Sequence, residues 1–310
     1  MKPCLTDCVE FQGRASLVKR IGKEIVFAKD NLVFCSSPFS SNRPFSGIFY
    51  HKFACSYTIQ NVCFVFLSPM YDSDNVENSF ENSDIVEEHL LVLDESGAFT
   101  LISLSLGFVV QIFKISGISN VVDIIGSSIP GEFSVITKSQ IIHCRLGLNP
   151  EIISKAQISV SKIQQYHDGF LLLSKGNLFF NQYESVNDFD SNQNIYSFLV
   201  DDEKVLIVKK IRNNFGFHVI GGISFGVKGC SIYDFQKGYF CGLCKGAKLV
   251  FVNTYNMKQL VVSLKQRPDQ NMKYNNIFIF PSKDQKALIV ILSNVDAMIT
   301  ISVPLSLLKE

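Results

Sequence analysis

The sequence of 310 residues has no tryptophan and almost no net charge, and it lacks the marks of an exported protein. Its net charge is +1, and its scattered lysines and arginines form no concentrated basic run of the kind that nucleic-acid binding uses. It contains no Asn-X-Ser/Thr sequon, and its N-terminus has no apolar stretch of the signal-peptide type. The nine cysteines show no disulfide framework. We therefore expect an intracellular protein, cytoplasmic or nuclear, with no clear nucleic-acid partner.

Long apolar runs are also scarce. The segment 96–113 carries no charge over 18 residues, which just meets the length needed for a membrane span. Small and polar residues interrupt it, namely Gly97, Thr100, Ser103, Ser105, Gly107 and Gln111. Because Gly107 sits where a β-turn would fall, we expect a strand, a turn and a strand here, and no membrane span.

Short apolar runs separated by turns that contain glycine or aspartate recur along the whole chain. Residues 89–113 and 239–264 both read as strand, tight turn, strand, short break, strand. The 27 phenylalanines, many of them inside these runs, favour strands as well. The pattern predicts eight strand pairs, at 24–35, 47–67, 88–104, 133–146, 170–181, 194–210, 240–252 and 287–303.

These units, with weaker copies at 129–146 and 287–303, resemble the blades of a WD40-like β-propeller. The resemblance implies an all-β chain forming a single β-propeller of about seven four-stranded blades, with six blades or an incomplete ring as alternatives. It also implies a platform for protein interactions. The Gly-His and Trp-Asp signatures of that family are absent, so no functional residue is carried over. We expect the propeller to span 1–303 and the tail 304–310 to begin a helix at Pro304.

Two polar insertions interrupt the pattern, at 71–88 and 184–194, and we expect both to be exposed loops. The first contains acids and no lysine or arginine. It reads either as a solvated linker or as a docking segment for a basic partner. The acids that would contact such a partner are Asp72, Asp74, Glu77, Glu81 and Asp84.

Cys241 and Cys244 form the only CxxC motif, a spacing that can begin a zinc site. Cys230 and His218 are the nearest candidates for the remaining ligands. The motif lies where a strand enters a turn, and there two residues three apart point to different faces. Two ordinary strand cysteines and a redox pair are the alternatives. We expect no metal site, no cofactor and no catalytic residues.

The function that fits this reading is a non-catalytic protein–protein interaction scaffold, a subunit of a multi-protein complex with other protein subunits as partners and no small-molecule substrate. The irregular stretch SSPFSSNRPFSGIFY offers Phe39, Phe45 and Tyr50 as contact residues, with packing between blades as the alternative role. Two other functions stay open. One is an enzyme or small-ligand binder using the central channel, and the other is a nucleic-acid or membrane-surface adaptor.

Overall fold

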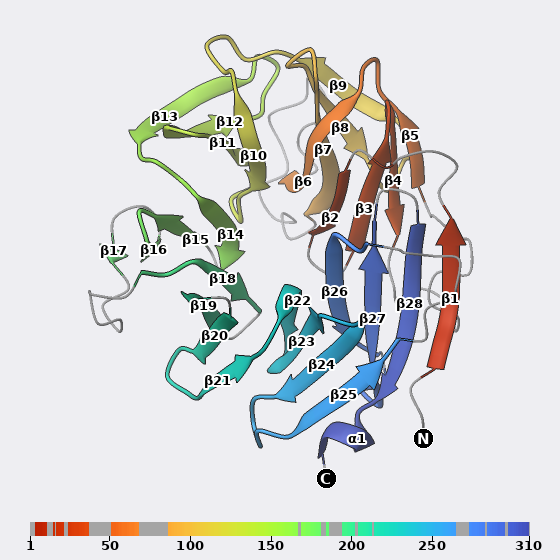
Figure 1. Ribbon diagram of the computed structural model, residues 1–310. Coiled ribbons are helices and arrows are strands. Elements are labelled where there is room, and N and C mark those ends of the chain that lie inside the picture. The colour runs from red at the N-terminus through yellow and green to blue at the C-terminus, as the bar shows by residue number, and fades with distance from the viewer. Residues whose placement is uncertain are drawn as a thin grey trace.

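The computed structural model describes residues 4–10, 15, 17–21, 24–36, 51–67, 86–166, 169–180, 184–185, 194–201, 204–212, 214–264, 273–282, 284–294 and 297–309. Seven four-stranded antiparallel sheets lie around a common centre and form a propeller (Figure 1). The prediction of about seven blades in one all-β ring is confirmed.

Each blade is numbered in chain order, and its strands are given from the innermost outward. Blade 1 holds β2 (Leu17–Ile21), β3 (Glu24–Lys29), β4 (Leu32–Ser36) and β5 (His51–Ala54); blade 2 holds β6 (Ile59–Leu67), β7 (Glu87–Asp94), β8 (Phe99–Ser103) and β9 (Val109–Phe113); blade 3 holds β10 (Val121–Gly126), β11 (Glu132–Thr137), β12 (Gln140–Arg145) and β13 (Glu151–Gln157); blade 4 holds β14 (Lys162–Tyr166), β15 (Gly169–Ser174), β16 (Asn177–Phe180) and β17 (Glu184–Ser185). Blade 5 holds β18 (Ser197–Val200), β19 (Val205–Ile211), β20 (Asn214–Val219) and β21 (Ser224–Val227); blade 6 holds β22 (Cys230–Gln236), β23 (Tyr239–Cys244), β24 (Lys248–Asn253) and β25 (Gln259–Ser263); blade 7 holds β26 (Asn276–Pro281), β27 (Ala287–Ser293), β28 (Ala297–Pro304) and, outermost, β1 (Cys4–Glu10).

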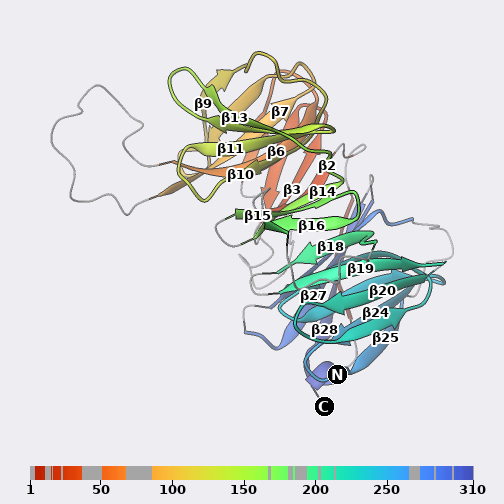
Figure 2. The ribbon, with the colours of Figure 1, turned by 90° about the vertical axis from the view of Figure 1, so that its left-hand side faces the viewer.

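The ring is closed by strands from the two ends of the chain. β1 pairs antiparallel with β28, from Cys4 opposite Ser302 to Glu10 opposite Ala297. Blade 7 is therefore complete only with an N-terminal strand. A one-turn helix, α1 (Ser306–Lys309), follows β28, contacts β24, β25 and β28, and lies below β28 in both views (Figures 1 and 2).

The apolar core lies between the blades and is divided into seven clusters, one for each pair of neighbouring blades. Both faces of a blade are covered, so its central strands are apolar almost throughout, and alternate side chains serve alternate neighbours. In β23, Phe240 and Cys244 pack toward blade 5, whereas Cys241 and Leu243 pack toward blade 7. Burial between sheets therefore positions the innermost strands around the axis.

Seven of the eight predicted strand pairs are hairpins within one blade. The prediction of a pair at 47–67 was wrong, because β5 is the outermost strand of blade 1 and β6 is the innermost strand of blade 2. The intervening link is held by backbone hydrogen bonds from Cys55 N to Asn31 O (2.7 Å) and from Ile59 N to Asp30 O (2.8 Å). It therefore passes from one sheet to the next instead of forming a hairpin turn.

The predicted polar loops are shorter than expected where the structure describes them. Glu87 and Glu88 belong to β7, and Glu184 and Ser185 form β17. Residues 71–85 and 186–193 lie outside the described residues. The recurring unit recognised in the sequence, at 89–113 and 239–264, corresponds to the second, third and fourth strands of a blade.

Candidate functional site

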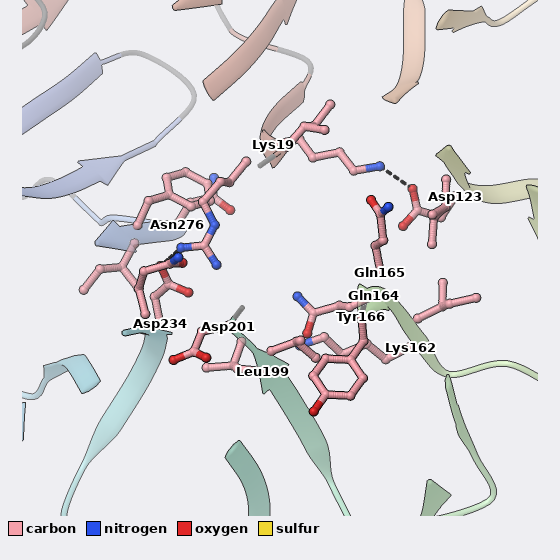
Figure 3. Close-up of a pocket in the computed structure, with 18 of the residues that line it drawn as sticks. Lys19, Asp123, Lys162, Gln164, Gln165, Tyr166, Leu199, Asp201, Asp234 and Asn276 are labelled. Carbon is pink, nitrogen blue, oxygen red and sulfur yellow. Dashed lines mark hydrogen bonds and ion pairs between the residues drawn. The ribbon is translucent and has the colours of Figure 1, made fainter. Parts of the chain in front are cut away.

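All seven innermost strands line a central channel of about 1360 Å³. These strands contribute charged and amide side chains as well as apolar ones. Figure 3 shows Gln164 and Gln165 of β14 extending into the space between the Lys19–Asp123 pair and Asp234. The channel is the place where residues far apart in the sequence meet.

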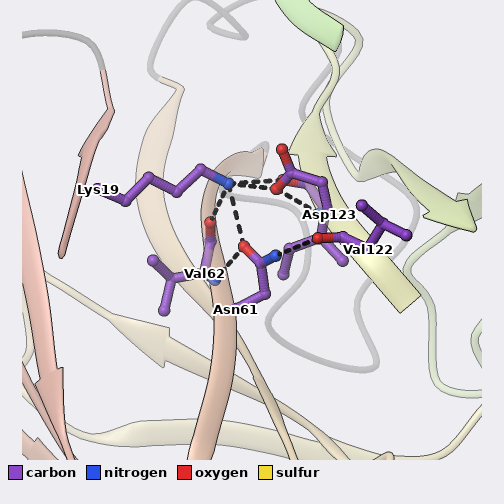
Figure 4. A network of polar contacts seen from close by, with 6 residues as sticks. Lys19, Asn61, Val62, Val122 and Asp123 are labelled. Carbon is purple, nitrogen blue, oxygen red and sulfur yellow. Dashed lines mark hydrogen bonds and ion pairs between the residues drawn. The ribbon is translucent and has the colours of Figure 1, made fainter. Parts of the chain in front are cut away.

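Lys19 of β2 joins three blades. Its Nζ donates to Asn61 Oδ1 (3.1 Å) and Val62 O (3.0 Å) in blade 2, and to Asp123 Oδ1 (2.5 Å) in blade 3 (Figure 4). The acceptors are placed by irregularities in β6 and β10, whose registers shift just before Asn61 and Asp123. In both strands the side-chain oxygen also accepts the next backbone N–H, that of Val62 or Ile124. The bulges thus aim two oxygens at one ammonium group.

Arg20, the next residue, reaches around the ring in the other direction. Its NH1 donates to Asp234 Oδ2 (2.6 Å) in blade 6, and also to Ile279 O (3.4 Å) in blade 7. Asp234 Oδ2 accepts the backbone N–H of Ile279 as well (2.9 Å). Burial raises the pKa of Asp234, although Arg20 and the Ile279 N–H act to lower it. This ion pair is enclosed and ties blades 6, 7 and 1 together.

Lys162 of β14 links blades 4 and 5 by hydrogen bonds in the same way. Its Nζ donates to Ser197 Oγ (3.2 Å) and to Phe198 O (2.5 Å), and it lies 5.4 Å from the centre of the Phe198 ring. Burial lowers the pKa of Lys162 to about 8, with Asp234 opposing the shift and Arg20 adding to it. An amine of this pKa is partly neutral near neutral pH, which is a feature of many functional lysines.

Gln164 is the unsatisfied polar group of the channel wall. Its Oε1 is buried and has no hydrogen-bond partner among the described residues. A buried acceptor without a donor costs free energy. This atom is therefore a polar point of the channel wall whose capacity to accept a hydrogen bond is unused.

A second notable surface lies on the outer edge of blade 2, which we call the blade 2 apolar edge. It consists of the exposed side chains Leu106, Phe108, Val109, Val110 and Ile112. The register of β9 against β8 shifts at Val110, since Gln111 lies opposite Leu101 and Val109 lies opposite Ile102. Strict alternation is therefore interrupted, and apolar side chains are exposed at successive positions. Phe108 and Ile112 are 53% and 61% exposed, and β9 carries no charged residue. The turn before it is fixed by hydrogen bonds from Gly107 N to Ser103 O and from Ser103 N to Phe108 O, both 3.0 Å.

The comparisons with known proteins identify the fold. No family model and no curated protein matches this sequence. The solved β-propeller domain of Myceliophteria thermophila Cps50 (Swd1) matches with a TM-score of 0.61, covering 97% of this chain and 100% of that chain at 9% identity. The chain has the fold of a seven-bladed β-propeller. Since 1211 solved chains match, this likeness shows architecture and assigns no activity.

The propeller separates the residues of the predicted zinc site. Cys241 packs between blades 6 and 7, whereas Cys230 and Cys244 pack between blades 5 and 6. His218 lies on β20, where its Nδ1 is 2.8 Å from Ser224 Oγ. Among the described residues, no group of three or more His, Cys, Asp or Glu is placed to hold a metal ion. Of the four candidate ligands, the structure thus brings together Cys230 and Cys244.

The candidate partner residues cannot be placed. They all lie outside the described residues: Phe39, Phe45, Tyr50, Asp72, Asp74, Glu77, Glu81 and Asp84. The uncharged segment 96–113 forms β8 and β9, as the strand–turn–strand reading predicted. Within the described ranges, no helix is long and apolar enough to cross a membrane.

Sequence reasoning missed the channel residues altogether. Lys19 and Arg20 are adjacent in β2, and Asp123 and Asp234 are the only charged residues of β10 and β22; the paired partners are up to 214 positions apart. The available signal was a charge within a predicted strand, since such a residue needs a partner when it is buried. That signal indicates a buried pair without telling which residues form it.

Proposed function

We propose that this chain is a non-catalytic scaffold that binds other proteins within a multi-protein complex, and that the blade 2 apolar edge is one of its docking surfaces. The observation that carries the proposal is the composition of β9. Natural proteins usually protect exposed edge strands with charged residues or proline, because an unpaired apolar edge recruits other chains. β9 has neither, and with the turn before it exposes five apolar side chains together, so it is suited to an extended apolar segment of a partner that adds a further strand.

The pairing of the charged side chains in the channel supports a structural role for them rather than a catalytic one. Lys19 is paired with Asp123, and Arg20 with Asp234, so these charges are engaged by the protein itself. They hold neighbouring blades together and make the ring a rigid support. A rigid support positions binding surfaces without a loss of conformational entropy on binding.

The thiol content supports an intracellular location, cytoplasmic or nuclear. The cysteines whose side chains are described are buried and form no disulfide bond with one another, namely Cys35, Cys55, Cys63, Cys144, Cys230, Cys241 and Cys244. Free thiols in this number are typical of a reducing compartment. The loop residues named from the sequence, including Phe45 and Asp74, remain predictions for further contacts.

The test is affinity purification of the tagged full chain from its native cells, followed by mass spectrometry. We expect the wild type to co-purify with a reproducible set of proteins and the double variant Phe108→Asp, Ile112→Asp to lose at least one of them about tenfold. Charges at the centre of an apolar contact remain unpaired when the partner desolvates them, which costs several kcal/mol.

The matched control is Val261→Asp on β25 of blade 6. Val261 is also exposed on an outermost strand, but polar Gln259 and Ser263 flank it on the same face. We expect this variant to retain every partner. Circular dichroism and thermal unfolding must show that both variants keep the wild-type fold. Recovery of the wild type as an isolated monomer, or full retention of partners by the double variant, would argue against the proposal.

A further inference from the structure

Cys230 and Cys244 lie directly opposite each other across β22 and β23 in blade 6. The backbone hydrogen bond from Lys245 N to Gly229 O (3.0 Å) joins the residues just outside this pair. A pair flanked in this way is a non-hydrogen-bonded pair, in which the Cα atoms are about 4.5 Å apart. That separation lies within the range of about 4.4–6.8 Å that disulfide bonds span.

Both side chains lie in the same buried cluster, and each thiol donates to a backbone carbonyl. Cys230 donates to Ile232 O (3.4 Å), and Cys244 donates to Gly242 O (3.9 Å). Gly242, two residues before Cys244 on the same face, leaves room for the Cys230 side chain, because a Cβ built on it would lie 2.6 Å from Cys230 Sγ. The Cys230 sulfur therefore already lies over the face of β23 that carries Cys244.

The electrostatic interaction between the two side chains also gives the two thiols different acidities. It lowers the pKa of Cys244, and it raises the pKa of Cys230, which burial raises further. Cys244 is thus the thiol that ionises first, and the thiolate is the form that attacks a disulfide. Both residues keep a small exposed fraction, 7% for Cys230 and 8% for Cys244, beside the turns at the end of the blade.

We propose that Cys230 and Cys244 form a reversible disulfide bond, with a low-molecular-weight disulfide such as glutathione disulfide as the oxidant. The Cys244 thiolate attacks one sulfur of the oxidant, a mixed disulfide forms at Cys244, and the first small thiol leaves. Cys230 then attacks Cys244 Sγ, and the second small thiol leaves. Two protein thiols lose two electrons and two protons, which one small disulfide accepts as it becomes two thiols.

This bond would tie the innermost strand of blade 6 to its neighbour. Cys230 and Cys244 belong to the cluster that packs blade 6 against blade 5. The modification therefore adds a covalent link on the channel side of that cluster. It involves neither the blade 2 apolar edge nor its partners, so it is independent of the scaffold proposal.

The test is exposure of the full-length protein to a series of glutathione redox buffers under native conditions. Acid quenching, alkylation and peptide mapping without reduction then report which cysteines are linked. We expect a peptide joined through Cys230 and Cys244, a loss of two titratable thiols per chain, and full reversal by dithiothreitol. Circular dichroism before quenching establishes that the protein is folded.

Three variants make the outcome specific. Cys230→Ser should lose the link and keep a glutathione adduct on Cys244, because the second thiol is missing. Cys244→Ser should lose both the link and the adduct. Cys55→Ser, which removes a cysteine of equal 8% exposure at the blade 1–2 interface, should leave the link unchanged. Absence of the Cys230–Cys244 peptide from folded wild type in every buffer, or a Cys241–Cys244 link in its place, would overturn the proposal.

Discussion

At the level of single residues, the channel is defined by a few charges that pair across blades. Asp234 is 5% exposed and accepts from both Arg20 and the Ile279 backbone, whereas the ion pair of Arg145 with Glu132 lies at the surface, with Arg145 54% exposed. A charge left unpaired in a buried site keeps its desolvation cost, and one at the surface regains water. The two pairs should therefore differ in their effect on stability.

We predict that Asp234→Asn lowers the free energy of unfolding by about 3–5 kcal/mol, because it leaves the Arg20 guanidinium buried without a counter-charge. Glu132→Gln, the matched change at the surface pair, should cost less than about 1 kcal/mol. Guanidinium denaturation of both variants measures the difference. Equal losses in the two variants would show that the channel pair contributes no more than a surface contact.

The sequence predicted some residue environments and not others. The separation of Cys241 from Cys244 onto opposite faces followed from strand alternation alone. The pairing of Lys19 with Asp123 did not, since no local rule relates positions in different blades. Cys230 and Cys244 were named together from proximity in sequence, but their direct opposition depends on the register of β22 and β23.

At the level of the element, the hairpins of the outer strands were predictable, whereas among the innermost strands only β18 was predicted with its true partner, in the pair at 194–210. Turn residues between apolar runs mark the second to fourth strands of a blade, as in β7 to β9. The first strand follows a link of varied length, and its channel side accepts polar residues, as in KIQQY of β14. Its pattern is therefore neither fully apolar nor alternating. The pair expected at 47–67 failed because β5 and β6 belong to neighbouring blades.

The contact between blades 3 and 4 also belongs to this scale. Its buried cluster is the smallest of the seven, consisting of Ile136, Ile141, Ile163 and Leu172. Nearby, the ring of His143 on β12 stacks on Phe170 of β15 with centroids 6.1 Å apart. His143 Nδ1 lies 2.9 Å from Ser134 Oγ. Burial lowers the pKa of His143, and Glu132 partly opposes the shift, so the folded protein holds this imidazole neutral.

We predict that this contact weakens as the pH falls below about 6.5. The unfolded chain then binds a proton at His143 that the folded chain resists, so the folded state loses stability as the pH decreases. Thermal unfolding between pH 7.5 and 5.5 should show a steeper decline in Tm for wild type than for His143→Gln. Parallel declines in the two proteins would exclude His143 as the group responsible.

At the level of the whole molecule, the spacing of the turns in the sequence predicted the number of blades. The sequence did not show which strands close the ring. β1 pairs with β28, and nothing in MKPCLTDCVE indicates a partner almost a full chain length away. Hydrophobic patterning shows which side chains are buried but leaves strand partners undetermined. The strand pairing that closes the ring could therefore be assigned only from the structure.

We predict that removing residues 1–10 lowers Tm and promotes association, because β28 then presents an unpaired apolar edge. A synthetic peptide of residues 1–13 added in trans should restore Tm toward the wild-type value, and a scrambled peptide should not. Differential scanning fluorimetry and size-exclusion chromatography with light scattering provide the readouts. An unchanged Tm in a monomeric truncated protein would show that β1 contributes little to closure.

The pairing of β1 with β28 also governs how the protein is made. β1 leaves the ribosome before the other strands of the propeller, but β28, the strand it binds, is the last of the described strands to be synthesised. At translation rates of about 5–20 residues per second, the nascent β1 waits on the order of tens of seconds for that partner. During this interval six blades can assemble in order, while the seventh stays open until β28 is made. The disc therefore becomes continuous only after its last strand has left the ribosome.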